Sequence, residues 1–429
     1  MTDKHGKRFA RVKLISLFLL SFVLAACQSN ANRSQGPLLV GPSAPEVRAQ
    51  NADANANLQN ASVFLDVAIP TFDPGFPMDR NTGEIDYEEL DDEGIWPQLR
   101  RTEAKLFAVE TKKAMQSEKV FGSVVVVPDA STPSDLFVLG TITHSDSEVV
   151  GASVTVVDSS GEIWGIQEFK HEVSQNFFRD QRNSGKNPYE PIFKQISGYV
   201  VSLLSKLSEQ DKQQIKDMSL MRYARYYSPE AFGQYIETDV KRKNGQRYYK
   251  FELNGLPDKS DPMLARIEEL RAQELLFIDR LQDQYEVFDA QVGPSYQTWQ
   301  EQTLPELEAA REAAFKRNAS AAAGIGLGIL AAILAKNSGS SAGQVGAVLG
   351  GIGSVVAINE AFKSNSAMKV HNAVIEEQGQ AVDLSVGPTE MEFEDNTIEL
   401  QGTATEQYMQ WKTHLRNIYS LESTPDTQL

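Results

Sequence analysis

The sequence predicts an α+β protein: a small mixed α/β sheet domain, followed by a long helical, coiled-coil-like stalk that carries a glycine-rich apolar helical hairpin. Three observations predict this fold class. Short β-branched runs alternate with amphipathic stretches between residues 61 and 208. Apolar residues then recur at threes, fours and occasional fives from Pro262, which is close to a coiled-coil seam. Within that helical part, residues 319–358 are rich in glycine and alanine and carry a single charged side chain, Lys336.

The overall composition excludes several classes of function. The 429 residues carry a net charge of −17, which argues against nucleic acid, because phosphate binding needs clustered lysine and arginine. The same charge argues against electrostatic adhesion to anionic lipid. Five histidines and one cysteine leave little material for a metal site. We therefore expect no metal and no cofactor.

The first residues predict export. Residues 1–26 have a basic start and an apolar run, Leu14–Leu24, that is too short to span a bilayer well, as in a signal peptide. The run ends in Leu-Ala-Ala-Cys, which resembles the bacterial lipobox. That resemblance implies cleavage before Cys27 and acylation of its thiol, which anchors a chain stably. The alternative is cleavage at a nearby small residue that leaves a free thiol. By resemblance to enteric sorting, Gln28 favours an outer-membrane lipoprotein that faces the periplasm.

Residues 27–60 predict a disordered tether, because their Asn, Ala, Ser and Gln cannot bury enough surface to fold alone. Residues 61–208 predict five strands and two helices. The acidic stretch Ile85–Gly94 lacks the order of a calcium loop and is interpreted as a solvated loop. The expected strands are Val63–Phe72, Val120–Pro128, Asp135–Ile142, Val149–Asp158 and Glu162–Val173, and the expected helices are Leu99–Ser117 and Pro191–Leu207.

This order of elements, with the stretches VAIPTF, EAKLFAVETKKAM, SDLFVLGTIT and VTVVDSSGEIWGIQEF, resembles a known family. It is similar to the small α/β domains of the curli-secretion lipoprotein CsgG and of the amino terminus of TolB. The positions that match the family pattern are Asp135, Gly140, Asp158, Gly161 and Trp164. The resemblance covers about a third of the chain. It implies a domain that assembles, scaffolds or binds partners in the periplasm and is not an enzyme.

Residues 209–261 form a connecting segment that is rich in tyrosine. Tyr223, Tyr226 and Tyr227 are a possible partner surface, because Tyr and Arg are enriched in interface hot spots. The favoured alternative is a helix that packs these aromatics against the sheet domain. Lys241–Gly255 predicts a small hairpin around Asn244-Gly245 whose basic residues form a surface turn.

Residues 262–388 predict the stalk, interrupted at Gly293-Pro294, with the hairpin at 319–358. The arms of the hairpin are Asn318–Ala335 and Ser338–Asn359. Each glycine costs a soluble helix about 1 kcal/mol, so close helix packing has to offset it. Either the hairpin enters a membrane or it is buried in a soluble bundle or oligomer. The small residues spaced by four that would allow this packing are Gly324, Gly328, Gly346 and Gly350.

Residues 389–429 predict a strand pair around Asp395-Asn396 and a helix, Glu406–Tyr419. The sequence holds no nucleophile elbow, phosphate loop or zinc-protease motif. We therefore expect a non-enzymatic cell-envelope lipoprotein that acts as a structural or assembly accessory of a periplasmic or outer-membrane complex, in export or surface biogenesis. Its expected partners are other envelope proteins and further copies of itself. The alternatives are an oligomeric pore that inserts the 319–358 hairpin, and a ligand-binding module with an exposed tyrosine cluster.

Overall fold

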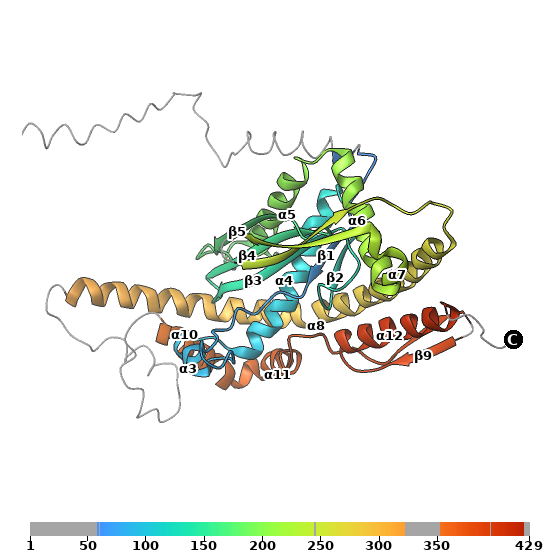
Figure 1. The fold of residues 1–429 in the computed structure, drawn as a ribbon. Coiled ribbons are helices and arrows are strands. Elements are labelled where there is room, and N and C mark those ends of the chain that lie inside the picture. Colours follow the sequence, from blue (N-terminus) through green and yellow to red (C-terminus); the bar gives the residue numbers. More distant parts are fainter. Residues whose placement is uncertain (1–57, 60, 244–245, 322–351, 395, 424–429) are drawn as a thin grey trace, which may run out of the picture. The chain divides into compact units, whose positions relative to one another are not determined.

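The structure is a computed structural model, and it describes residues 58–59, 61–243, 246–321, 352–394 and 396–423. Five strands form one mixed sheet in the order β2-β1-β3-β4-β5 (Figure 1). Strand β1 is parallel to both β2 and β3, and β3, β4 and β5 form an antiparallel meander. The strands are β1 Val67–Pro70, β2 Val124–Val127, β3 Leu136–Ser145, β4 Val149–Asp158 and β5 Ile163–Glu172. The predicted five-stranded mixed sheet is therefore confirmed.

Two helices of this part of the chain pack on the sheet and on each other. Helix α4 (Pro97–Glu118) makes the crossover between the parallel strands β1 and β2, which a parallel pair requires. Helix α5 (Glu190–Leu204) follows the meander. The Phe107 ring of α4 meets the ring of Phe193 edge-to-face, with centroids 5.2 Å apart. Both helices agree with the ranges that periodicity predicts.

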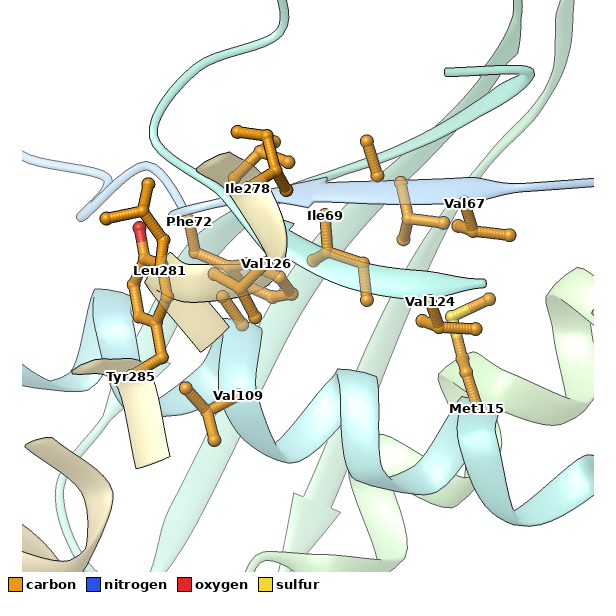
Figure 2. Close-up of a cluster of buried hydrophobic side chains, with 14 of the residues drawn as sticks. Val67, Ile69, Phe72, Val109, Met115, Val124, Val126, Ile278, Leu281 and Tyr285 are labelled. Carbon is orange, nitrogen blue, oxygen red and sulfur yellow. The ribbon is translucent and has the colours of Figure 1, made fainter. Parts of the chain in front are cut away.

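The long helix α8 (Pro262–Ala321, 60 residues) is part of the same hydrophobic core. Its side chains Ile278, Leu281 and Tyr285 lie among sheet residues such as Val126 (Figure 2). Figure 2 also labels Val67, Ile69, Phe72, Val109, Met115 and Val124 in this cluster. The expectation that the first half of this helix is a stalk separate from the sheet domain is therefore wrong. Its apolar seam packs on the sheet domain, where a coiled coil would need another helix.

Helix α8 also covers the edge of the sheet. Strand β2 is an edge strand, whose open backbone groups invite pairing with another chain. The Gln282 amide oxygen accepts from the Val126 N–H (2.9 Å), and the Gln282 amide nitrogen donates to the Val126 carbonyl (2.8 Å). One side chain thus replaces the next strand at this position.

The predicted interruption at Gly293-Pro294 is also wrong, because α8 continues through Pro294 and Pro305. A proline inside a helix removes one hydrogen bond and crowds the preceding turn. Buried Val292 and Tyr296 flank Pro294, and their packing holds the helix on both sides. Tertiary burial here outweighs the local cost.

The remaining elements include the expected hairpin, strand pair and last helix. The acidic stretch expected to be a solvated loop instead forms a short helix, Tyr87–Asp92, whose Leu90 is buried, so that expectation is wrong. The strand pair around residue 395 forms a two-stranded sheet of its own and does not join the first one. Leu58 is buried, so the folded body begins inside the segment predicted as a tether. These elements are α3 Tyr87–Asp92, η2 Gln181–Asn183, α6 Glu209–Tyr227, α7 Pro229–Phe232, η3 Gly233–Tyr235, β6 Ile236–Lys243, β7 Gln246–Leu253, α10 Ile352–Ser364, η4 Ser366–Met368, α11 Lys369–Gln378, β8 Thr389–Phe393, β9 Asn396–Leu400 and α12 Ala404–Ser423.

Candidate functional site

Two of the predicted sites fall outside the described residues. These are the lipidation site at Cys27 and the four glycines of the predicted hairpin, Gly324, Gly328, Gly346 and Gly350. The structure does describe the two helices that flank the predicted hairpin, α8 and α10, and it describes the whole of the tyrosine-rich helix α6.

The three tyrosines of the possible partner surface have different surroundings. Tyr223 and Tyr227 are buried, with 6% and 7% of their surface exposed, and their hydroxyl oxygens lie 3.2 Å apart. Tyr226 is 40% exposed, and the Lys412 ammonium lies 4.6 Å from its ring centroid. Tyr223 and Tyr227 are therefore packed inside the protein, but their partners are Glu274 of α8 and Tyr419 of α12 and not the sheet. Only Tyr226 is available at the surface.

The buried tyrosines lead to a buried carboxylate. Glu274 of α8 is fully buried and accepts hydrogen bonds from the hydroxyls of Tyr223 of α6 (2.8 Å) and Tyr408 of α12 (2.5 Å). Burial raises the pKa of the Glu274 carboxyl, while the nearby Lys412 and the two hydroxyls act in the opposite direction. Burial also raises the pKa of the Tyr408 hydroxyl, so this group remains a donor at neutral pH. The carboxylate joins three helices that are far apart in sequence.

A second buried carboxylate joins α4 to α8 and β3. Glu103 of α4 accepts from the hydroxyls of Ser145 (2.6 Å) and Tyr296 (2.8 Å) and from the Arg100 guanidinium (3.1 Å). Burial raises the pKa of its carboxyl, and Arg100 lowers it. A buried charge is tolerated only when hydrogen bonds and a counter-charge surround it, as they do here. This group is also a tertiary link.

A buried lysine holds the segment that follows α11. Lys105 of α4 is 1% exposed, and its ammonium donates to the carbonyls of Gln378 (2.5 Å) and Ala381 (2.8 Å). Burial lowers the pKa of Lys105 to about 8, and Asp383 opposes that shift. The lysine satisfies carbonyls at a helix C-terminus, which otherwise lack donors.

Two of the positions that match the family pattern hold the sheet together. The Asp135 carboxylate is buried and accepts from the backbone N–H of Asp66 (3.0 Å) and from the Lys216 ammonium (2.9 Å). A Cβ at Gly140 would lie 2.3 Å from the Phe72 ring. The first residue ties strand β1 to helix α6, and the second lets an aromatic ring cover β3.

The other three matching positions form the turn between β4 and β5. The Asp158 carboxylate accepts from the Ser160 backbone N–H (2.8 Å) and from the Trp164 indole N–H (2.9 Å). Gly161 has a φ of +79°, and a Cβ there would lie 2.0 Å from the carbonyl oxygen of Tyr249. All five positions therefore serve the fold.

A hollow of about 470 Å³ lies between α4, β2 and α8. Lys112 and Asp279 line it from facing helices, with Gln282 between them and the strand edge. The Lys112 ammonium is 3.7 Å from Glu286. Cations and carboxylates mix in this hollow, so the lining selects neither an anion nor a cation.

Helices α8 and α10, which lead into and out of the predicted hairpin, lie in contact. The Trp299 indole N–H of α8 donates to the Asn359 side-chain oxygen of α10 (3.2 Å). One turn earlier in α8, the Ser295 hydroxyl lies 3.1 Å from the Nδ1 atom of His371 in α11. The two segments therefore run antiparallel. Asn318, where the first arm starts, lies 19 residues beyond Trp299 in α8, or about 28 Å. Asn318, where the first arm starts, and Asn359, where the second arm ends, therefore lie at different levels along α8.

Sequence reasoning missed the buried charges. Glu274 follows Leu270 by four residues and precedes Ile278 by four, so it occupies an apolar seam position. A carboxylate on a seam is a signal of a buried polar link. The hydrogen-bond partners of Glu274 could not be predicted from the sequence, because Tyr223 and Tyr408 come from helices that are distant in the sequence.

Comparisons with known proteins give no assignment. No protein-family model matches the chain, and neither the curated proteins nor the solved structures contain a match. Among the described residues, no group of His, Cys, Asp or Glu is placed to hold a metal ion. None of the described helices is long and apolar enough to cross a membrane.

Proposed function

We propose that the chain is a non-enzymatic outer-membrane lipoprotein, acylated at Cys27, facing the periplasm. It acts as a structural accessory of an envelope complex, in export or surface biogenesis. The observation that carries this proposal is the placement of α8, which belongs to the core of the sheet domain and leads directly into the apolar segment 319–358. The Trp299–Asn359 contact brings the chain back to the same body. A rigid, anchored body therefore presents an apolar segment, as an assembly element requires.

The buried titratable groups support the same proposal. Glu103, Glu274 and Lys105 have shifted pKa values, which often marks catalytic groups. Each of them instead joins segments distant in sequence through side-chain hydrogen bonds. Their shifts follow from structural burial, and they favour a scaffold over an enzyme.

The second candidate is an oligomeric pore that inserts the hairpin. Its arms would need to lie side by side across the same bilayer. A helical second arm running back from Asn359 needs about 19 residues to reach the level of Asn318. The level at which α10 meets α8, well before the start of the first arm, therefore favours the assembly role over the pore.

The experiment replaces residues 322–351 by a 20-residue Gly/Ser linker in the full chain. Ala321 and Ile352 lie about 33 Å and about 10 Å beyond the Trp299–Asn359 contact, and a linker of this length averages about 25 Å. We expect an unchanged melting temperature and outer-membrane fractionation, with loss of the large complex in native gels. Cys27→Ala is the matched variant, which should lose membrane fractionation and keep the fold.

An unchanged complex in the linker variant would contradict the proposal. Dye release from lipid vesicles separates the two candidates. Release by the wild-type chain that the linker variant lacks would establish the pore, and no release with a lost complex would support the assembly role.

A further inference from the structure

The hairpin β6–β7 has a base that packs on the body. The Phe251 ring lies under the guanidinium of Arg222, 4.1 Å from the ring centroid. Arg225 of the same helix, α6, donates to the Thr238 hydroxyl (3.0 Å). Ile236 is buried at the start of β6. One face of the hairpin is thus fixed to α6 at its base.

The same face continues past α6 into solvent. Side chains alternate along strands, so the cross-strand pairs Val240–Tyr249 and Arg242–Arg247 share the face of Thr238 and Phe251. Val240 is 58% exposed and Tyr249 is 64% exposed, and both arginines are exposed. The backbone of Tyr249 lies against Gly161 of the β4–β5 turn, but the side chains on this face of the outer half are exposed, and we call this outer half the arm.

The two arginines are placed against each other. Arg242 and Arg247 are direct partners in the register of the hairpin, and like charges directly opposite destabilise a strand pair. Among the described residues, neither guanidinium has a carboxylate partner, whereas the neighbouring Lys241 pairs with Asp239 (2.9 Å). A pair of facing arginines with an exposed tyrosine fits an anionic partner.

The chain itself offers such a partner. Helix α3 and its flanks carry exposed carboxylates with an exposed tyrosine, Tyr87 (64%), and the last turn of α3 has acidic residues and no basic one. Carboxylates at a helix C-terminus face the negative end of its dipole, so this surface also gains from an opposite charge. The exposed carboxylates are Glu84, Glu88, Glu89, Asp91, Asp92 and Glu93.

We propose that the arm formed by the outer half of β6–β7 docks on the acidic α3 surface of a second copy of this chain. The inference rests on the proposed assembly role and specifies its self-contact. An anionic membrane is the weaker partner, because a net charge of −17 opposes approach to anionic lipid. Arm and α3 are different surfaces, so the contact is head-to-tail and closes into a ring or grows into a line.

The test uses two full-length copies with different affinity tags, co-expressed and purified through one tag in mild detergent. Arg242→Glu with Arg247→Glu in both copies should lower co-purification at least tenfold. Asp91→Arg with Asp92→Arg in both copies, which reverses exposed carboxylates at the C-terminal end of α3, should do the same. One copy of each variant together should restore it, because every arm then faces an α3 surface of opposite charge.

The control is Lys206→Glu with Lys259→Glu, which changes the net charge equally at two exposed lysines outside both surfaces. Co-purification should then equal that of the wild type. Failure of the mixed pair to recover would overturn the inference. So would normal self-association of the arm variant together with lost binding to anionic vesicles. If wild-type copies do not co-purify at all, the self-assembly expected of the proposed function fails as well.

Discussion

The sheet domain and the long helix α8 differ in how far apart in the sequence their packing partners lie. In the sheet domain, neighbouring elements in sequence are neighbours in space, as in the meander β3–β4–β5. In α8, a regular seam of Leu, Ile and Phe buries itself against a strand edge formed more than a hundred residues earlier. The difference shows that periodicity identifies a buried face and does not identify what covers it.

The links between α8 and its distant partners should be the costliest to break. Glu274→Ala removes the acceptor of two buried hydroxyls, those of Tyr223 and Tyr408. We expect a loss of about 4 kcal/mol in the free energy of unfolding, because breaking a buried charged link leaves polar groups unpaired. Chemical denaturation measures it. Glu268→Ala, at an exposed site on the same helix, is the control and should change stability by less than about 0.5 kcal/mol.

The stability of the sheet domain should fall when an added methyl group crowds its core. Gly140→Ala places a methyl group 2.3 Å from the Phe72 ring, and we expect a loss of about 2 kcal/mol. Gly198→Ala is the matched substitution in α5, where nothing lies within 4 Å of the new methyl group. That change should stabilise the chain by about 0.5 kcal/mol. Thermal melts of the two variants should shift in opposite directions, and equal shifts would contradict the packing at Gly140.

The sheet edge is where the two regions meet. Gln282→Ala leaves the Val126 N–H and carbonyl without their partner, at a cost of about 1.5 kcal/mol. The freed edge should also promote aggregation, because it can pair with another chain. Light scattering after mild heating measures this. Gln284→Ala is the control, because Gln284 is exposed on the same helix, and this variant should behave as the wild type.

The smallest effect is the pH dependence from Lys105. Its pKa is lowered to about 8 in the folded chain, against 10.5 in the unfolded chain, so the unfolded chain binds more protons between these values. Stability from this group therefore rises as pH increases through that window. Between pH 7 and about 8.7, wild type should gain about 1 kcal/mol relative to Lys105→Met. Equal pH profiles for the two chains would show that Lys105 is not buried as described.

The sequence was sufficient wherever a signal was local. Alternation and β-branched runs predicted the five strands, and the Asn244-Gly245 dipeptide predicted the hairpin β6–β7. The predicted interruption at Gly293-Pro294 was wrong, because the helix there is held by the burial of Val292 and Tyr296, which depends on tertiary packing. The links made by Glu274 could not be predicted either, because its partners Tyr223 and Tyr408 come from two other helices that are distant in sequence. For the tyrosines, packing was the favoured alternative to a partner surface, and the structure buries Tyr223 and Tyr227.

The most direct test of this account is hydrogen exchange along α8 in the native full chain. If α8 belongs to the core of the sheet domain, the amides of residues 278–292 should be protected as strongly as those of strands β3 and β4, and should exchange only by global unfolding. Exchange of these amides through a separate, lower-energy opening, while the strands remain protected, would show that α8 is an independent stalk. That result would contradict the account.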